Sequence, residues 1–451
     1  MALRDDIRRQ MKKDKIEFIL VQFVDIHGAA KVKMVPVTNF DDVIDEGAGF
    51  AGGAVWGLGQ GPHSHDMLAR IDLATYTPLP WKPGVARFAS DLYVDGKPHL
   101  HCSRLNLKRV VSVLREVGYV FNVGIEPEHF LVVRTPEGIE VFDPAHVDTL
   151  NKACYDFKGI SGVLDYLQDM MRGLNALGWG CYQSDHEDAN GQYEINFTYS
   201  DALTTADRYT FFKMMSSEVA RRYGAVATHM PKPFANRTGS GAHIHFHMAD
   251  ARTGKNRFLD TKDRRGLGLS KLAYHFIGGI LAHARALCAV TSPTVNCYKR
   301  LAMGLDLFSS RSGYLWTPAF ITYGDNNRTQ MIRTAGPGHF EDRTISAGCN
   351  PYLAKAAYIF AGLDGIREKL DPGEPNLGNM YAVSSEERKR RKIDVLPQTL
   401  SEALDALEQD PVVLEALGVI APDFIELKRA EWKEYNRQVS AWEIERYLTM
   451  F

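Results

Sequence analysis

The chain has 451 residues, a formal net charge of −2 and 45% hydrophobic residues. This balance excludes a globally basic surface of the kind that binds nucleic acid, and the length favours two or three domains. No uninterrupted apolar stretch approaches the ~20 residues of a membrane span, and the N-terminus carries both charge signs without an apolar core, so neither a membrane partner nor a signal peptide is expected.

The first hundred residues read as a small domain, which we predict to span 1–100. Its predicted elements are a helix over 4–14, strands over 16–24, 29–35 and 85–94, and a short helix over 40–46. A glycine-rich loop, 47–61, lies between them. Glycine at this density lets the backbone approach a ligand or a neighbouring chain, and the interleaved Phe50 and Trp56 distinguish the loop from a flexible linker.

The remaining chain, 101–451, is predicted to form a second, larger domain in which helices and strands alternate. Helices are expected over 105–117, 162–173, 201–222, 268–289, 351–369, 401–407 and 423–448, and strands over 179–186, 192–198 and 242–248. Strands first, followed by strands mixed with helices, indicate an α+β protein with antiparallel neighbours. The six cysteines are scattered, without a CxxC pair, which is typical of reduced thiols in a cytoplasmic protein.

A short stretch at 124–130, GIEPEHF, lies in an apolar run that predicts a strand. Because side chains alternate along a strand, Glu126 and Glu128 share one face. Two neighbouring carboxylates are costly to bury without a cation, and hard divalent metals take oxygen ligands. Two half-exposed glutamates at a strand end would give the same pattern.

A second acidic segment, HEDANGQYE, reads as two strands joined by a turn at 188–191. This geometry lets Glu187 and Glu194 face one another across a hairpin. A hairpin with charged edges would look similar.

Three histidines follow in GSGAHIHFHM, where His243, His245 and His247 alternate onto one strand face. Imidazole binds metals and, when protonated, phosphate. A zinc site is an alternative, but zinc usually takes several histidines or thiols together, and here glutamates outnumber them. The glycines of the lead-in would let backbone N–H groups reach a carboxylate or phosphate.

Arginines complete the pattern: Arg300, Arg328, Arg333 and Arg343, the last beside Glu341. Arginine recognises carboxylate and phosphate in a bidentate manner, although salt-bridged surface arginines would also fit. Glutamates, histidines and arginines together suit ATP-dependent phosphoryl transfer to a carboxylate. No GxxxxGK[ST] motif is present, so this is not a P-loop enzyme.

With these motifs in order, the chain resembles the glutamine synthetase family, class I type, over nearly its whole length. The matching motifs are GIEPEHF, HE…GQYE, MPKPF…GSGAHIH, NCYKRL, NNR…IR, FEDR and NPYLAKAAYIFAGLDGI. The resemblance implies a small N-terminal β-grasp domain and a catalytic domain whose antiparallel half-barrel sheet is flanked by helices. It also implies a homo-oligomer, typically two stacked hexameric rings, with active sites between neighbouring subunits.

The resemblance also implies roles for single residues. Two divalent metals, Mg²⁺ or Mn²⁺, are expected, the first on Glu128, Glu187 and Glu194 and the second on Glu126, His243 and Glu341. The substrate carboxylate is expected on Arg300 and Arg343 with the backbone of Gly239, and the ATP phosphates on Arg328, Arg333 and His245. Arg333 is also expected to act on the phosphoryl group in transfer.

The departures from the family concern the ammonia site. The family loop FDGSS supplies an aspartate from a neighbouring subunit, but here Ala51 replaces it; the flap GYEAP supplies a glutamate, but here Asp306 stands in GLDLF. Thr238 replaces a usual asparagine. Loss of a carboxylate disfavours ammonium and makes room for an alkyl group, and the FAGGAVWG loop with HEDANGQ resembles the γ-glutamylmethylamide synthetase branch.

The expected reaction joins L-glutamate to methylamine at the expense of ATP, through a γ-glutamyl phosphate. Asp306 is the candidate acceptor of the amine's proton, with Glu187 as a possible helper. The alternatives are glutamine synthetase, a ligase for another amine such as a polyamine, a guanidino kinase with an arginine-rich ATP site, and a catalytically silent relative. Tyr381 lies where some family members are adenylylated, but its surroundings differ, and an ordinary packed or exposed tyrosine is expected.

Overall fold

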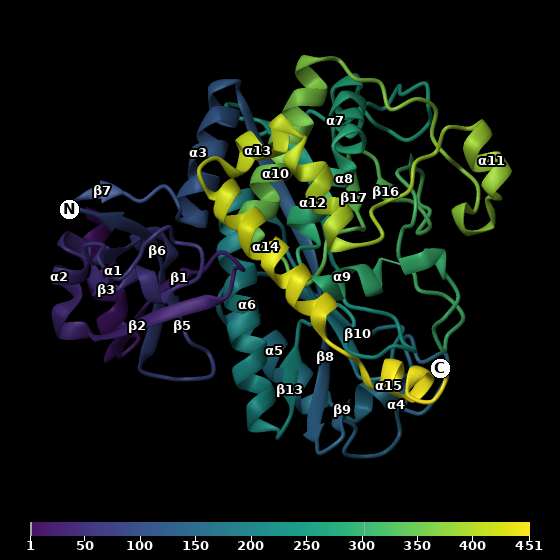
Figure 1. Cartoon of the computed structure of the whole chain (residues 1–451). Helices are drawn as coiled ribbons and strands as arrows, with labels where there is room; N and C mark the ends of the chain where they lie inside the picture. The colour runs from purple at the N-terminus through teal and green to yellow at the C-terminus, as the bar shows by residue number, and fades with distance from the viewer. Residues whose placement is uncertain (1, 302) are drawn as a thin grey trace.

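The computed structural model describes residues 2–301 and 303–451, and Figure 1 shows a small N-terminal unit beside a larger one. Within the described residues, each unit is built on its own sheet. The predicted α+β architecture, a β-grasp domain followed by a larger catalytic domain, is confirmed. The limits 1–100 and 101–451 stay a prediction.

The N-terminal sheet has the order β2-β1-β6-β4-β3, and β5 and β7 pair with β6. β1 and β6 are parallel, whereas the remaining pairs are antiparallel. The strands are β1 (Phe18–Val24), β2 (Ala30–Pro36), β3 (Ala48–Phe50), β4 (Met67–Ile71), β5 (Thr77–Pro78), β6 (Val85–Val94) and β7 (Lys97–Pro98), with helices α1 (Ala2–Lys13) and α2 (Phe40–Asp45). Its core lies between this sheet and the two helices.

The second sheet has the order β10-β11-β8-β14-β17-β16-β15, and β9, β12 and β13 also pair with β8. Apart from the parallel pair β15–β16, these strands are antiparallel. The strands are β8 (Tyr119–Thr135), β9 (Gly138–Val141), β10 (Cys181–His186), β11 (Gln192–Phe197), β12 (Ser200–Asp201), β13 (Val226–Thr228), β14 (Ala242–Asp250), β15 (Tyr323–Gly324), β16 (Ile332–Gly336) and β17 (His339–Asp342).

Helices cover this sheet and enclose the larger core. They are α3 (Ser103–Glu116), α4 (Phe157–Ser161), α5 (Leu164–Ala176), α6 (Ala202–Arg222), α7 (Lys271–Ala282), α8 (Ala284–Thr291), α9 (Val295–Arg300), α10 (Pro351–Arg367), α11 (Ser385–Arg390), α12 (Leu400–Glu408), α13 (Pro411–Leu417), α14 (Ile420–Arg437) and α15 (Ala441–Tyr447). In Figure 1, α14 crosses in front of the helical layer and leads to the C-terminus.

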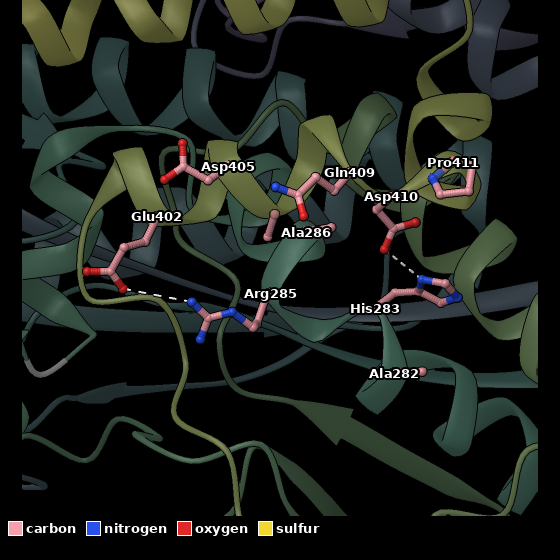
Figure 2. A pocket seen from close by; sticks show the side chains of 10 residues that line it. Ala282, His283, Arg285, Ala286, Glu402, Asp405, Gln409, Asp410 and Pro411 are labelled. Carbon is pink, nitrogen blue, oxygen red and sulfur yellow. Dashed lines mark hydrogen bonds and ion pairs between the residues drawn. The ribbon is translucent and has the colours of Figure 1, made fainter.

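The single helix predicted over 268–289 is wrong, because the chain bends by 75° between α7 and α8. His283, at the bend, lies between two carboxylates: its Nδ1 is 2.7 Å from Asp410 Oδ2 and its Nε2 is 3.1 Å from Asp364 Oδ2. Figure 2 shows the pocket that His283 lines with Arg285 and Glu402. None of the predicted site residues lines this pocket.

The helix predicted over 423–448 is also interrupted. It begins earlier, at Ile420, and stops at Arg437. A new helix then starts at Ala441; the hydroxyl of its N-cap, Ser440, accepts from the Glu443 N–H, while the Glu443 carboxylate accepts from the Ser440 N–H. This reciprocal capping box is a start signal for a helix. Within the described residues, no single helix is long and apolar enough to cross a membrane, and only the bent pair α7–α8 taken together meets those criteria by length and composition.

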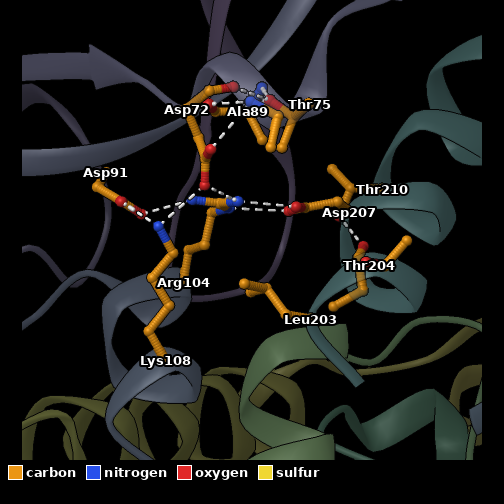
Figure 3. Close-up of polar contacts among 12 residues, drawn as sticks. Asp72, Thr75, Ala89, Asp91, Arg104, Lys108, Leu203, Thr204, Asp207 and Thr210 are labelled. Carbon is orange, nitrogen blue, oxygen red and sulfur yellow. Dashed lines mark hydrogen bonds and ion pairs between the residues drawn. The ribbon is translucent and has the colours of Figure 1, made fainter. Parts of the chain in front are cut away.

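A buried ion-pair network joins the two units (Figure 3). Arg104 of α3 contacts Asp91 of β6 at 2.8 Å, Asp72 after β4 at 2.9 Å and Asp207 of α6 at 2.9 Å. Lys108, one turn further along α3, also pairs with Asp72, at 3.0 Å. The guanidinium thus connects the N-terminal sheet to helices that pack on the larger one.

Candidate active site

Strand register brings the predicted acids onto one face of the larger sheet. On β8, Glu126 and Glu128 are two residues apart, so their side chains lie on the same face of the sheet. Glu194 of β11 lies directly opposite Glu128, and Asp185 of β10 lies opposite Glu194. Residues directly opposite one another on neighbouring strands share a face. A row of carboxylates (Glu126, Glu128, Glu194 and Asp185) therefore crosses three strands, and we call this side of the sheet the acidic face.

The same face continues on the other side of β8. His243 of β14 lies opposite Glu126, and His245 lies opposite Glu341 of β17, which in turn lies opposite Arg333 of β16. Histidine and arginine side chains thus lie beside the row of acids on the same face. The alternation predicted for the histidines placed His243 and His245 on this face.

One group of three carboxylates, Glu128, Glu187 and Glu194, has oxygens that all lie within 4.8 Å of one another. Burial and the neighbouring Glu128 and Asp185 carboxylates raise the pKa of Glu187 well above its ordinary value. Burial, Glu126 and Glu187 do the same for the pKa of Glu194. Like charges crowded in a low dielectric resist ionisation, and a bound cation would relieve them.

A second group consists of Glu126, His245 and Glu341, again with ligand atoms within 4.8 Å of one another. His245 Nε2 lies 3.0 Å from Glu126 Oε1, whereas His243 Nε2 lies 3.0 Å from Glu128 Oε1. His245, rather than His243, therefore completes this group in the structure. The assignment of His243 to the second metal stays a prediction, and His243 lies between the two groups.

Three arginines converge at the edge of this face. Arg343 Nη1 and Arg333 Nη1 each lie 2.6 Å from a different oxygen of Glu341, which is fully buried. Burial raises the pKa of Glu341, but Arg343 and His245 outweigh burial and hold that pKa well below its ordinary value. Arg300, also buried, donates to the carbonyl oxygens of Thr344 at 2.9 Å and Arg343 at 3.1 Å. Their remaining N–H groups can bind an anion.

The glycine at 239 is required by close packing. A Cβ at Gly239 would lie 2.2 Å from the Pro231 carbonyl oxygen and 3.0 Å from Arg300 Cγ. The Gly239 carbonyl accepts from Gln192 Nε2 at 3.2 Å, and the same amide donates to Glu128 Oε2 at 2.9 Å. Thr238 Oγ1 lies 3.2 Å from Gln192 Oε1. Gly239 is thus joined to the acidic face by one side chain.

Three predicted residues lie away from this cluster. Arg328 is exposed on the turn before β16, and no ion pair or side-chain hydrogen bond links it to the described residues. Ala51 is exposed on the N-terminal unit, after β3. Asp306 is exposed and lines a cavity of about 520 Å³ with Lys232 and Lys299. Their roles stay predictions.

The strand–turn–strand reading of HEDANGQYE holds, and its turn is fixed by a residue that the sequence did not suggest. Asp148 accepts from His186 Nε2 at 2.8 Å, from Asn190 Nδ2 at 2.8 Å and from the Gly191 N–H at 2.7 Å. Gly191 has φ +73°, and a Cβ there would lie 2.5 Å from Val141. Asp148 therefore positions the hairpin that carries Glu187 and Glu194.

Two further carboxylates were missed. Asp185 lies on the acidic face with Oδ1 buried and without a hydrogen-bond partner among the described residues, and burial, Glu126 and Glu128 raise its pKa to about 6. Counting back two residues from Glu187 along the strand would have found it. Asp188 binds Ser312 and Trp316, which lie more than a hundred residues later, and no local signal points to that contact.

Two more features complete the site. A pocket of about 480 Å³ opens beside Glu126 and His245 and is lined by aromatic and histidine side chains, including Tyr182, Tyr199 and His339.

Tyr381 is a packed tyrosine: it is 9% exposed, and its hydroxyl donates to the Thr317 carbonyl at 2.8 Å.

Comparisons with known proteins agree over almost the whole chain. The glutamine synthetase β-grasp domain model matches residues 15–95 and the glutamine synthetase catalytic domain model matches residues 100–447. A glutamate–methylamine ligase of Methyloversatilis universalis is 47% identical, covering 98% of each chain, and a glutamine synthetase of Rhizobium meliloti is 39% identical, covering 97% of this chain and 98% of that one.

Solved structures give the same result. A GmaS/ADP complex has a TM-score of 0.91 at 42% identity, covering 98% of this chain and 99% of the other. Apo GmaS without ligand has a TM-score of 0.88 at 41% identity, covering 97% and 98%. With two family models spanning both units and near-complete coverage, the chain belongs to the glutamine synthetase family.

Proposed function

We propose that this chain is an ATP-dependent ligase that joins the γ-carboxylate of L-glutamate to methylamine, giving γ-glutamylmethylamide, ADP and phosphate. The observation that carries the proposal is the single sheet face on which two groups of metal-ligating side chains adjoin three buried arginines. The similarity to a glutamate–methylamine ligase supports methylamine as the amine.

The two ligand groups fit divalent cations, which we propose to be Mg²⁺ or Mn²⁺. Their donors are carboxylate oxygens and one imidazole, the ligand types that such ions take, and two of the carboxylates are held with raised pKa values. When bound, these ions would neutralise the acids and stabilise negative charge on the phosphates of ATP.

In the first step, a γ-carboxylate oxygen of glutamate attacks the γ-phosphorus of ATP, the bond to ADP breaks, and γ-glutamyl phosphate forms. Arg300 and Arg343 hold the substrate carboxylate beside the backbone of Gly239. Arg333 and Arg328 contact the ATP phosphates, and charge on the transferring group is spread over Arg333. The nucleoside occupies the pocket beside Glu126 and His245.

In the second step, the methylamine nitrogen attacks the acyl carbon, the bond to phosphate breaks, and the nitrogen loses a proton. Asp306 accepts that proton, with Glu187 as a helper. Ala51 of a neighbouring subunit presents a methyl group where other family members present a carboxylate, which favours an alkyl amine over ammonium.

The test is ADP release with glutamate and ATP in the presence of methylamine, ammonia, ethylamine or a polyamine at matched concentrations. We expect methylamine to have the highest kcat/KM. A preference for ammonia would instead assign the chain as a glutamine synthetase, and a preference for a polyamine would assign a different γ-glutamyl ligase.

The loop residue gives a sharper version of this test. Ala51→Asp restores a carboxylate and is expected to shift the ratio of kcat/KM for methylamine to that for ammonia by roughly tenfold toward ammonia, the size of effect that one methyl group has in a shaped pocket. Ala54→Asp, three residues later in the same loop, is the matched control. An unchanged ratio in Ala51→Asp would refute the role of this loop.

We also propose a homo-oligomer of two stacked hexameric rings in the cytoplasm. Trp442, Ile444 and Leu448 of the C-terminal segment are 59%, 49% and 76% exposed, so this apolar stripe is uncovered in a single chain and suits a neighbouring subunit. All six cysteines are free thiols among the described residues, which fits a reducing compartment. Native mass spectrometry tests the assembly, and a monomer would contradict it.

A further inference from the structure

The segment 309–317, which follows Asp306, is fastened to the turn between β10 and β11. Ser312 Oγ donates to Asp188 Oδ2 at 2.5 Å and Trp316 Nε1 donates to Asp188 Oδ1 at 3.0 Å. Arg311 extends the attachment, with Nη2 2.8 Å from Asn151 Oδ1 and Nη1 3.2 Å from Asn190 Oδ1. The segment therefore lies next to Glu187, the residue that precedes Asp188.

The other side of this segment reaches the arginine cluster. The Trp316 carbonyl accepts from Arg343 Nη2 at 3.3 Å, while Arg343 Nη1 holds Glu341. Trp316 thus spans the distance between Asp188 and Arg343, on two sides of the acidic face. Asp306, in contrast, makes no side-chain hydrogen bond or ion pair with any described residue.

Trp316 is held in an uncommon conformation with an open ring. Its φ is +57°, which non-glycine residues rarely adopt, and such strain persists where several contacts fix the residue, often at functional sites. The residue is 38% exposed although both its Nε1 and its carbonyl are engaged. A large apolar surface therefore remains free next to the arginines.

Other aromatic rings adjoin Trp316. The Tyr314 ring lies 5.4 Å from it, and Tyr381 and Phe308 lie 6.3 Å and 5.7 Å from Tyr314. Phe308 is 56% exposed and Tyr314 is 39% exposed. Aromatic faces attract alkylammonium groups and pack well against methyl groups. This aromatic cluster (Phe308, Tyr314, Trp316 and Tyr381) is suited to a small alkyl amine.

We propose that Trp316 is a specificity-determining residue for the amine, and that its indole face receives the methyl group of methylamine while the nitrogen points toward the acyl carbon held by Arg343. Asp188 is a positioning residue that sets the plane of the ring. This inference rests on the proposed function and deepens it: Ala51 makes room for an alkyl group, whereas Trp316 supplies the surface that the group contacts.

The expected size of the effect follows from the chemistry. A shaped apolar pocket discriminates one methyl or methylene group by roughly 10- to 200-fold. Ammonia has no methyl group to place on the ring, so removal of the indole is expected to act on methylamine and to leave ammonia almost unaffected. Glutamate and ATP lie on the other groups of the site, so their KM values are expected to change little.

The experiment compares Trp316→Leu and Trp316→Phe with the wild type, using ADP release with methylamine and with ammonia. Trp316→Leu should lower kcat/KM for methylamine at least tenfold and kcat/KM for ammonia less than threefold, and Trp316→Phe should recover most of the loss because it keeps an aromatic face. Tyr435→Leu, at an aromatic residue with the same 38% exposure on α14, is the matched control and should change neither value.

A readout apart from turnover uses tryptophan emission. In wild-type protein loaded with glutamate and a non-hydrolysable ATP analogue, methylamine should produce a saturable change in emission that Trp316→Phe lacks. This measurement also decides the question if Trp316→Leu does not fold.

Two results would overturn the proposal: an unchanged ratio of kcat/KM for methylamine to that for ammonia in Trp316→Leu, including an equal loss for both amines, or an emission change that survives in Trp316→Phe. In each of these cases a wild-type preference for methylamine would leave the proposed function standing. A wild type that prefers ammonia would remove the proposed function and the assignment of Trp316 together.

Discussion

The molecule contains two buried clusters of carboxylates that differ in how their charge is balanced. In the network of Figure 3, burial raises the pKa of Asp72, but Arg104 and Lys108 outweigh burial and lower it. On the acidic face, Glu187 and Glu194 have pKa values well above the ordinary value because of burial and neighbouring carboxylates. The first cluster brings its own cations, and the second lacks them on the β10–β11 side within the described residues.

This difference separates a structural role from a functional one. A buried cluster whose carboxylates are each paired with a cation of the chain fixes the two units together without an ion from solution. A cluster with surplus negative charge is unfavourable by itself, and such local conflicts are expected where a ligand completes the balance. Buried carboxylates thus stabilise the contact between the two units in the first cluster and form a candidate binding site in the second.

The largest expected loss of activity comes from a substitution on the acidic face, where the carboxylates have surplus negative charge. Glu194→Gln removes one of the three oxygens grouped with Glu128 and Glu187, and we expect kcat/KM to fall by at least about 100-fold, since even indirect support of a metal ligand is worth roughly 10- to 100-fold. ADP release at saturating Mg²⁺ measures it. Glu140→Gln, at an exposed glutamate on the neighbouring strand β9, should retain activity.

The same variant should respond differently to divalent ions. At 100 times its Kd, an ion that binds only the folded state adds about 2.7 kcal/mol to the free energy of unfolding. The melting temperature of the wild type should rise when Mg²⁺ or Mn²⁺ replaces EDTA, and that of Glu194→Gln should rise less. An equal rise in both proteins would contradict the assignment of Glu194.

A substitution in the Arg104 network should have the opposite effect, a loss of stability with little loss of activity. Arg104→Ala leaves Asp72, Asp91 and Asp207 without their shared cation, and loss of one member of a buried ion pair costs about 3–5 kcal/mol. We expect the free energy of unfolding in urea to fall by that amount and kcat/KM per folded molecule to stay within a fewfold of the wild type.

Arg115→Ala, at an exposed arginine on the same helix, controls for the loss of an α3 side chain. Divalent ions should not restore the stability of Arg104→Ala beyond their effect on the wild type. A specific rescue by Mg²⁺ would mean that the two clusters are not distinct in the way that their pKa values indicate.

The smallest expected effect concerns pH. The pKa of Asp185 is about 6 in the folded protein against an ordinary 3.8, so in this interval the folded state holds more protons than the unfolded state. Its contribution to the stability of metal-free protein therefore falls as pH rises from 3.8 to about 6. Asp185→Asn should make the melting temperature in EDTA less dependent on pH over that interval. An unchanged dependence of the melting temperature on pH would show that the neighbouring acids do not raise the pKa of Asp185.

The sequence predicted the elements whose logic is local. Two-residue alternation placed Glu126 and Glu128 on one strand face, and the same rule applied to β14 put His243 and His245 beside them. The bend at His283 could not be predicted, because Asp410 and Asp364 that hold its ring are 127 and 81 residues away. The contact of Asp188 with Trp316 spans 128 residues and was missed for the same reason.

The acidic face itself was predictable as a set but not in its pairings. Chemistry and resemblance named the two histidines and every acid of this face except Asp185, yet which imidazole reaches which carboxylate depends on rotamers that strand alternation leaves open. His243 and His245 have the same position in the pattern, and only their neighbours, Glu128 and Glu126, distinguish them.

The long strand β8 sets a limit on how such a chain can diverge. It pairs along its length with β9, β11, β12, β13 and β14, and it carries both Glu126 and Glu128. An insertion of a single amino acid ahead of Ile125 would turn both carboxylates into the hydrophobic interior and send Ile125 outward. Insertions and deletions compatible with activity must therefore fall in the connecting loops.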